Sequence, residues 1–118
     1  MDSLSNESEG IEVRETEILQ LCRLKASECG ATLWRNNTGK LEDKKGRWVT
    51  FGFVGSGDLI GFRNSDGKFI SLEVKVPGKK ASPEQVRFIN AVLKAGGIAG
   101  VVYGPEDVEK LLCTTPKS

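Results

Sequence analysis

The chain has 118 residues, 38% hydrophobic and 28% charged, which indicates one soluble globular domain large enough to bury its own core. It contains no histidine, which excludes Ser-His-Asp and Cys-His nucleophilic sites, histidine acid–base catalysis and histidine-ligated zinc. The formal net charge of +1 hides an uneven distribution, because residues 35–87 hold eleven basic residues against six acidic ones. This basic middle segment suits a polyanionic partner, although from charge alone a solvated surface is the simpler interpretation.

The cysteines and the absence of targeting signals indicate the compartment. Cys22, Cys29 and Cys113 form no CxxC pair, and an odd, scattered count predicts buried thiols in a reducing compartment rather than a disulfide framework. No apolar run is long enough to span a membrane, and no signal peptide begins the chain. We therefore expect a cytoplasmic protein. A GxxxxGK[ST] loop is also missing, so we expect no nucleotide cofactor.

The first half of the chain is predicted to be a tail, a helix and several strands. Residues 1–10 are rich in Ser, Asn and Glu and are expected to be a disordered tail before a single domain over residues 11–118. Residues 11–29 have a helical pattern that ends at Gly30. Residues 36–46 are polar and turn-rich, and Asn64–Gly67 is a strong turn signal. Strands are predicted over residues 31–35, 47–53, 58–62 and 68–76.

The second half is predicted to be helix, strand, helix. Ser82 is expected to cap a helix in which Pro83 takes the first position and Gln85 completes a capping box. The expected buried face of this helix comprises Val86, Ile89, Val92 and Leu93. A buried strand over residues 98–103 and a short helix over 105–112 follow. The core order is α-β-β-β-α-β-α, in which three consecutive strands form a meander and a helix then crosses to a further strand parallel to one of them. This predicts an α/β fold with a mixed central sheet flanked by helices.

Two carboxylates are predicted to face each other across the hairpin around Asn64–Gly67. If these four residues form the loop, Arg63 lies opposite Lys68 and Asp58 lies opposite Glu73. Alternation then places Lys75 beside Glu73, and it turns Ile70, Leu72, Val74 and Val76 towards the core.

Opposed like charges destabilise a sheet unless a cation or a shared proton lies between them. Oxygen ligands of this kind suit Mg²⁺ or Mn²⁺, which would polarise a phosphoryl oxygen and activate water, with Lys75 offsetting charge. A surface ion pair between Glu73 and Lys75, with Asp58 capping a turn, is the alternative.

A third carboxylate could come from the first helix. Glu15 shares the face of Ile18 and Cys22, whereas Glu17 shares that of Leu21 and Leu24. The spacing leaves both candidates open, and a solvated position is possible for either.

Four sequence blocks in order closely resemble the VRR-NUC domain, a branch of the PD-(D/E)xK nuclease superfamily. The blocks are RNNTG (35–39), GSGDLIGF (55–62), LEVKVPG (72–78) and SPEQVRFINAVLKAGG (82–97). The resemblance runs from about Glu15 to Val108. It implies a restriction-endonuclease-like α-β-β-β-α-β core, the order that the elements above also predict.

The resemblance also assigns roles to residues. The metal-binding Asp of the family matches Asp58, and its ExK residues match Glu73 and Lys75. The helix glutamine near the active site matches Gln85, and Val74 would offer its backbone carbonyl to the metal. Glu15 matches the helix-one glutamate, although Leu19 stands where Gln is usual. Gly57 replaces the proline of the usual GSPD form, which we expect to soften the turn before Asp58.

The activity implied is that of a Mg²⁺- or Mn²⁺-dependent DNA endonuclease that hydrolyses phosphodiester bonds. The chain looks like a stand-alone, phage-type member, similar to Holliday-junction resolvases that act as homodimers on branched DNA; if phage-encoded, it would work in the cytoplasm of a bacterial host. The alternative from another class is a non-cleaving nucleic-acid-binding module that keeps the nuclease fold. A protein-interaction subunit without DNA affinity is a third possibility.

Further residues could contact nucleic acid. Phosphate contacts are expected from Arg35, Asn36, Asn37, Lys79 and Lys80, with a polar turn as the other interpretation of the first three. The basic loop of Lys40, Lys44, Lys45 and Arg47 is either a DNA-gripping wing or a solvated loop. Trp34 and Trp48 are expected in the core or in a dimer interface.

Overall fold

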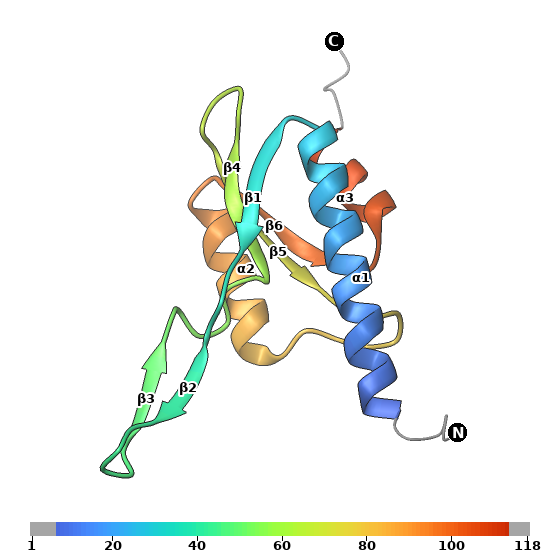
Figure 1. Cartoon of the computed structure of the whole chain (residues 1–118). Coiled ribbons are helices and arrows are strands. Elements are labelled where there is room, and N and C mark those ends of the chain that lie inside the picture. Colours follow the sequence, from blue (N-terminus) through green and yellow to red (C-terminus); the bar gives the residue numbers. More distant parts are fainter. Residues whose placement is uncertain (1–6, 114–118) are drawn as a thin grey trace.

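A computed structural model of the chain describes residues 7–113, which form a four-stranded sheet flanked by helices and a separate two-stranded hairpin (Figure 1). In chain order the elements are α1 (Glu7–Glu28), β1 (Ala31–Arg35), β2 (Gly39–Glu42), β3 (Trp48–Phe51), β4 (Leu59–Arg63), β5 (Phe69–Val74), α2 (Pro83–Lys94), β6 (Ile98–Val102) and α3 (Pro105–Leu112). Within this described part of the chain, no helix has the length and apolar character needed to span a membrane.

The main sheet is mixed, as the sequence predicted. Its strand order is β1-β4-β5-β6, in which β1, β4 and β5 are antiparallel neighbours and β6 runs parallel to β5. Parallel neighbours need a crossover connection, and α2 provides it. Helices α1 and α3 pack together on one side of the sheet, and α2 packs on β5 and β6 (Figure 1). The predicted α/β architecture with a parallel final strand is therefore confirmed.

Local predictions were wrong at three places. Residues 39–42, expected within a polar turn region, form β2, and the strand expected over residues 47–53 pairs with β2 rather than joining the meander. The GKLE sequence of β2 lacks the apolar alternation of a buried strand, so its pairing depends on its partner. Helix α1 begins at Glu7, so residues 7–10 are helical rather than part of a tail, while residues 1–6 lie outside the described residues.

The core lies between the sheet and the α1–α3 pair. The predicted inward residues of the fifth strand are confirmed, since Ile70, Leu72, Val74 and the following Val76 are all buried. Ile70, Leu72 and Val74 belong to a cluster with Leu19, Cys22 and Ala26 of α1 and with Val108 and Leu112 of α3. The opposite face of β5 is also buried, beneath α2, and it carries the polar side chains of Ser71 and Glu73. A polar group in that position needs hydrogen-bond partners to offset its lost hydration.

Helix α2 starts as predicted but buries less. Ser82 Oγ accepts a hydrogen bond from the backbone N–H of Gln85, and the Gln85 side chain accepts one from Ser82 N, which confirms the capping box. Val92 is buried, whereas Val86 and Leu93, predicted on the buried face, remain 44% and 50% exposed. The helix lies on only two strands, so its flanks stay open to solvent.

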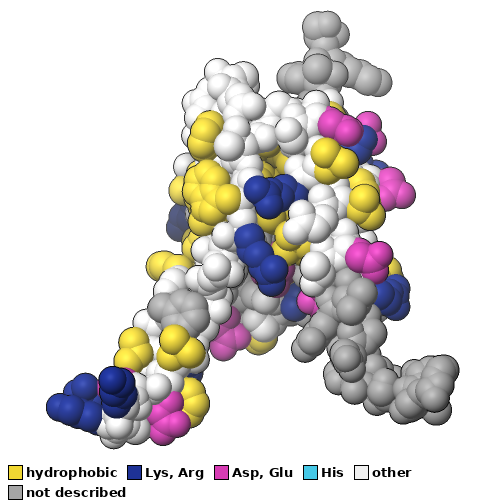
Figure 2. All heavy atoms as spheres, in the orientation of Figure 1, with side chains coloured by type: hydrophobic (Ala, Val, Ile, Leu, Met, Phe, Trp, Pro, Cys, Tyr) yellow, Lys and Arg dark blue, Asp and Glu magenta, His cyan; other side chains and the backbone are white. Residues whose placement is uncertain are grey.

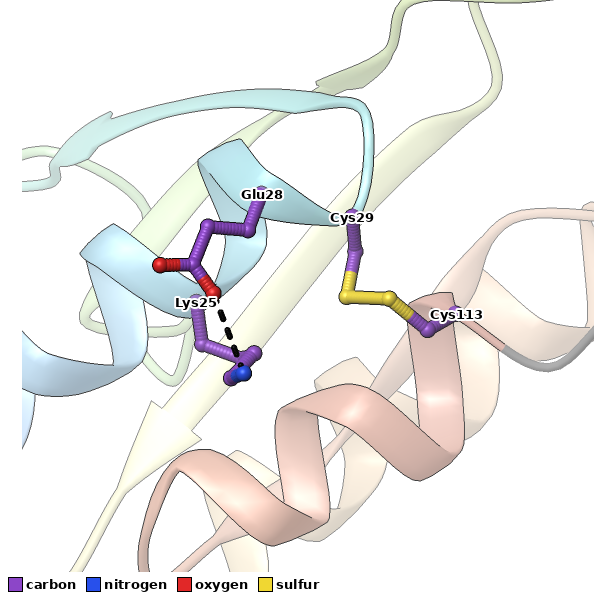
Figure 3. Close-up of a disulfide and its surroundings, with 4 residues drawn as sticks. All are labelled: Lys25, Glu28, Cys29 and Cys113. Atoms are coloured by element: carbon purple, nitrogen blue, oxygen red, sulfur yellow. Dashed lines mark ion pairs between the residues drawn. A yellow bond between two sulfur atoms is a disulfide. The ribbon is translucent and has the colours of Figure 1, made fainter.

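The cysteine prediction was wrong for two of the three residues. Cys29, just after α1, and Cys113, at the end of α3, form a disulfide beside the Lys25–Glu28 ion pair (Figure 3). Packing of α1 against α3 joins residues 84 positions apart, a proximity that no local spacing reveals. Cys22 is a buried free thiol, and burial raises its pKa to about 11, with smaller contributions from the charges of Asp107 and Glu106.

Candidate active site

The β4–β5 hairpin has the predicted register. Leu59 pairs with Leu72 and Phe62 with Phe69, and the Arg63 amide donates to the Lys68 carbonyl at 2.9 Å. One further step along each strand places Asp58 opposite Glu73. The hairpin therefore brings two carboxylates together at the end of the sheet.

Glu73 is a buried carboxyl group with a hydrogen bond at only one of its two oxygens among the described residues. Its side chain accepts a hydrogen bond at Oε2 from Gln85 Nε2 at 2.6 Å, while Oε1 is buried with no hydrogen-bond partner among the described residues. Burial raises the pKa of Glu73 to about 8, and the neighbouring charge of Asp58 adds to the effect, while Lys75 opposes it. An ionised carboxylate accepts hydrogen bonds but does not donate them, so only a shared proton or a cation satisfies two adjacent carboxyl groups.

Lys75 and Gln85 flank Glu73 as the sequence predicted. The Lys75 ammonium lies 3.7 Å from Glu73 Oε2, with about a fifth of its side chain exposed. The Gln85 amide makes two hydrogen bonds: its Oε1 accepts from Ser82 N in the α2 capping box, and its Nε2 donates to Glu73 Oε2. The start of α2 and the orientation of the carboxylate are thus set by one side chain.

A network of hydrogen bonds fixes the loop that carries Asp58. Asp58 Oδ2 accepts from the Val74 amide at 2.8 Å, and the Asp58 carbonyl accepts from the Asn36 amide. The Asn36 side chain donates to Ser56 Oγ and to the Gly57 carbonyl. The Gly57 amide donates to the buried hydroxyl of Ser71 at 3.0 Å. Both faces of the loop are therefore anchored, one to β1 and the other to β5.

Asp58 and Glu15 line the same cavity, of about 320 Å³, together with Thr16, Leu19, Arg35 and Val74. Glu17 is exposed and does not line it, which agrees with the exposure of Leu21 and Leu24 on the same helix face. Of the two alternatives in α1, only Glu15 lies towards Asp58. Figure 2 shows this hollow between β1 and α1, with basic side chains gathered over it.

The donor set fits a small divalent cation held largely by water. Within residues 7–113 no three Asp, Glu or Cys side chains converge closely enough to form a metal cluster by themselves. Mg²⁺, however, usually binds through one or two carboxylates and keeps several waters. Asp58 and Glu73 supply two adjacent carboxyl groups, and Oε1 of Glu73 is buried without a hydrogen-bond partner in the described part of the chain. A cation at this point would satisfy it.

The residues expected to contact nucleic acid differ in availability. Arg35 lines the cavity, and Asn37 is exposed beside it. Both amide hydrogens of Asn36 are used within the protein, so its described role is to hold the Asp58 loop. Lys79 and Lys80 are exposed after β5, and the Tyr103 hydroxyl donates to the Lys79 carbonyl and so fixes that segment.

Sequence reasoning missed the supporting residues Ser56 and Ser71. Ser71 is fully buried between Ile70 and Leu72, and its hydroxyl accepts from Gly57. A serine inside the most apolar strand of the chain was the available signal, because a buried hydroxyl needs a partner.

Comparison with known proteins bears on this geometry. The family model described as the VRR-NUC domain matches residues 13–106, from α1 to the first turn of α3. Its range includes every element that lines the cavity. No match was found among the curated proteins with which the chain was compared.

Proposed function

Since the chain belongs to the VRR-NUC family, whose domain is a nuclease domain, we propose that it is a metal-dependent DNA endonuclease selective for branched DNA. The observation that carries the proposal is the carboxyl pair Asp58 and Glu73. One member, Glu73, is buried, its pKa is raised by that burial, and its Oε1 has no hydrogen-bond partner among the described residues. Two adjacent carboxyl groups, one of them buried, do not stabilise the folded state by themselves, so their presence favours a functional role.

Asp58, Glu73 and the Val74 carbonyl would hold Mg²⁺ or Mn²⁺, and Glu15 would add a carboxylate from α1. The bound ion would supply the charge that polarises a phosphoryl oxygen and lowers the pKa of a water molecule. A bound cation would favour the ionised carboxylate and so oppose the rise in the pKa of Glu73.

The remaining roles belong to the side chains around the carboxyls. The Lys75 ammonium lies close enough to the carboxylates to orient a water and to offset charge at phosphorus. Gln85 holds Glu73 Oε2 and so leaves Oε1 for the cation. Arg35, on the cavity wall, would bind a phosphate of the cut strand, with Asn37, Lys79 and Lys80 contacting flanking phosphates.

Homodimerisation belongs to the same proposal. Trp34 and Phe62 pack edge to face with ring centroids 6.4 Å apart on strands β1 and β4, and they remain 46% and 40% exposed. Phe69, directly opposite Phe62 on β5, is also 42% exposed. This aromatic strip lies beside α2 and offers an apolar surface for a second copy. Two copies related by a two-fold axis could cut two strands of a junction.

The test is cleavage of labelled four-way junctions, flaps and plain duplexes with Mg²⁺, Mn²⁺ or EDTA. We expect cleavage of junctions that requires metal and is lost in Glu73→Gln and Lys75→Ala. Glu17→Gln is the matched control, because it removes a carboxylate from the solvent side of α1 and should cut normally. Equal cleavage of all substrates would refute the proposed branch selectivity, and sedimentation as a monomer would refute the proposed homodimer.

A second candidate is a nucleic-acid-binding module that does not cut. The observation in its favour is that, in the part of the chain that the structure describes, no third acidic side chain completes a cluster with Asp58 and Glu73. It predicts salt-sensitive DNA binding with no cleavage under either metal.

A further inference from the structure

The β2–β3 hairpin leaves its apolar side chains in solvent. Its two strands pair only with each other, as a sheet separate from the main one (Figure 1). Leu41, Trp48 and Val49 are 64%, 69% and 49% exposed. A two-stranded hairpin with exposed apolar residues is marginally stable in water, so a partner surface is expected to cover it.

The tip of the hairpin has more basic than acidic residues. Of its two acids, Glu42 is exposed and Asp43 is already engaged, because Asp43 pairs with Arg47 Nε at 2.8 Å and accepts from the backbone amides of Lys45 and Arg47. Lys44 and Lys45 are exposed, and basic side chains gather at this end of the molecule (Figure 2). Residues 40–47 therefore carry four basic residues against two acidic ones, and one of these acids, Asp43, is already paired with Arg47. A polyanion fits this tip better than a second copy of a nearly neutral chain does.

The hairpin is connected directly to the wall of the candidate active site. It is the segment between Arg35 and Asp58, both of which line the cavity, and its base is closed by the hydrogen bond from the Asn36 amide to the Asp58 carbonyl. From Asn36 to Lys44 the chain spans eight residues, which reach about 26 Å if extended at roughly 3.3 Å per residue. This distance corresponds to about seven or eight base pairs of duplex at roughly 3.4 Å each.

We propose that the β2–β3 hairpin is a second DNA-binding site, which grips the duplex arm some seven base pairs from the cut phosphate. Lys44 and Lys45 contact backbone phosphates there, and Trp48 packs its ring against sugars or an exposed base. The inference rests on the proposed nuclease function, since it needs DNA at the cavity. The hairpin would add a second DNA contact that only a sufficiently long duplex arm can reach.

The test compares Lys44→Ala/Lys45→Ala with the control Lys68→Ala/Lys94→Ala. The control removes the same charge from exposed positions at the opposite end of the sheet, beyond Phe69 and Ile98. Binding is measured in EDTA over a series of salt concentrations, on junctions with loop-closed arms of about 5 or 15 base pairs. On long arms we expect the hairpin variant to lower the slope of log K against log salt by about 2, at roughly 0.9 per phosphate contact. On short arms it should match the control, and Trp48→Ala should weaken binding only on long arms.

Each other outcome has a defined meaning. If long and short arms bind and are cut, but the two double variants behave alike, the hairpin proposal is overturned while the nuclease function stands. If the hairpin variants change sedimentation instead of the salt slope, the hairpin packs on a second copy, and the DNA grip is again refuted. If the unaltered chain binds no DNA at all, the proposed function itself fails, and the hairpin proposal fails with it.

Discussion

Gly57→Pro restores the residue that resembling sequences usually carry before the aspartate, yet the structure predicts that it is destabilising. The Gly57 amide donates to the hydroxyl of Ser71, which is 0% exposed, and proline has no N–H to give. Leaving a buried polar group without its partner costs about 1–3 kcal/mol. A Cβ at this position would also lie 2.6 Å from both the Leu72 carbonyl oxygen and Ser71 Oγ. Overpacking against backbone costs a further 1–3 kcal/mol or so, which gives about 2–6 kcal/mol in total.

Urea denaturation in EDTA measures this loss of unfolding free energy. With a slope of about 2 kcal/mol per molar urea, the midpoint should fall by roughly 1–3 M. Gly57→Ala is the matched control, since it adds the Cβ but keeps the N–H, so it should lose only the steric part. Cleavage should fall as well, because the same loop carries Asp58. A Gly57→Pro protein as stable as the unaltered chain would refute the assigned hydrogen bond and the close packing together.

Three further outcomes follow from the described contacts. Gln85→Leu should lower the free energy of unfolding by about 2–4 kcal/mol, because it opens the capping box and strips Glu73 of its donor; thermal denaturation measures this, and a loss below 1 kcal/mol or so would contradict it. In EDTA, stability should fall as pH rises from about 5 to 8, because folded Glu73, with its pKa raised to about 8, keeps a proton that the unfolded chain releases; Glu73→Gln should flatten the profile, and an unchanged slope would count against the shift. Cys113→Ser should cost up to about 4–5 kcal/mol of unfolding free energy under oxidising conditions and nothing in excess reductant, since the disulfide to Cys29 closes a loop of 84 residues; equal loss in both conditions would point to packing instead.

The carboxyl pair could be predicted from sequence because a local rule governed it. The turn signal at Asn64–Gly67 fixed the loop length, loop length fixed the register, and the register placed Asp58 opposite Glu73. The capping box at Ser82 and Gln85 was equally local. What neither rule contained was the second hydrogen bond of Gln85, which depends on how α2 lies across β5.

The features that escaped prediction all depend on packing between distant segments. The Cys29–Cys113 disulfide exists because α1 and α3 lie side by side, and no spacing in the sequence encodes that contact. The choice between Glu15 and Glu17 required knowing which face of α1 meets the sheet. The β2 strand has no apolar alternation of its own, so only its pairing with β3 reveals it.

Gln85 contributes both to the stability of α2 and to the position of the Glu73 carboxyl group, so a substitution at Gln85 affects both. A carboxyl with a raised pKa is a destabilising group until a proton or a cation neutralises it, and such groups drift unless they are held. Gln85 holds Glu73 through a side chain whose other end closes the first turn of α2. Glu73 therefore cannot reorient without releasing the Gln85 amide, which also closes the helix cap. The first turn of α2, which the fold requires in any case, therefore also fixes the Glu73 carboxyl group. In this way a chain of modest size can hold a buried acid in a position where Oε1 remains available to a cation.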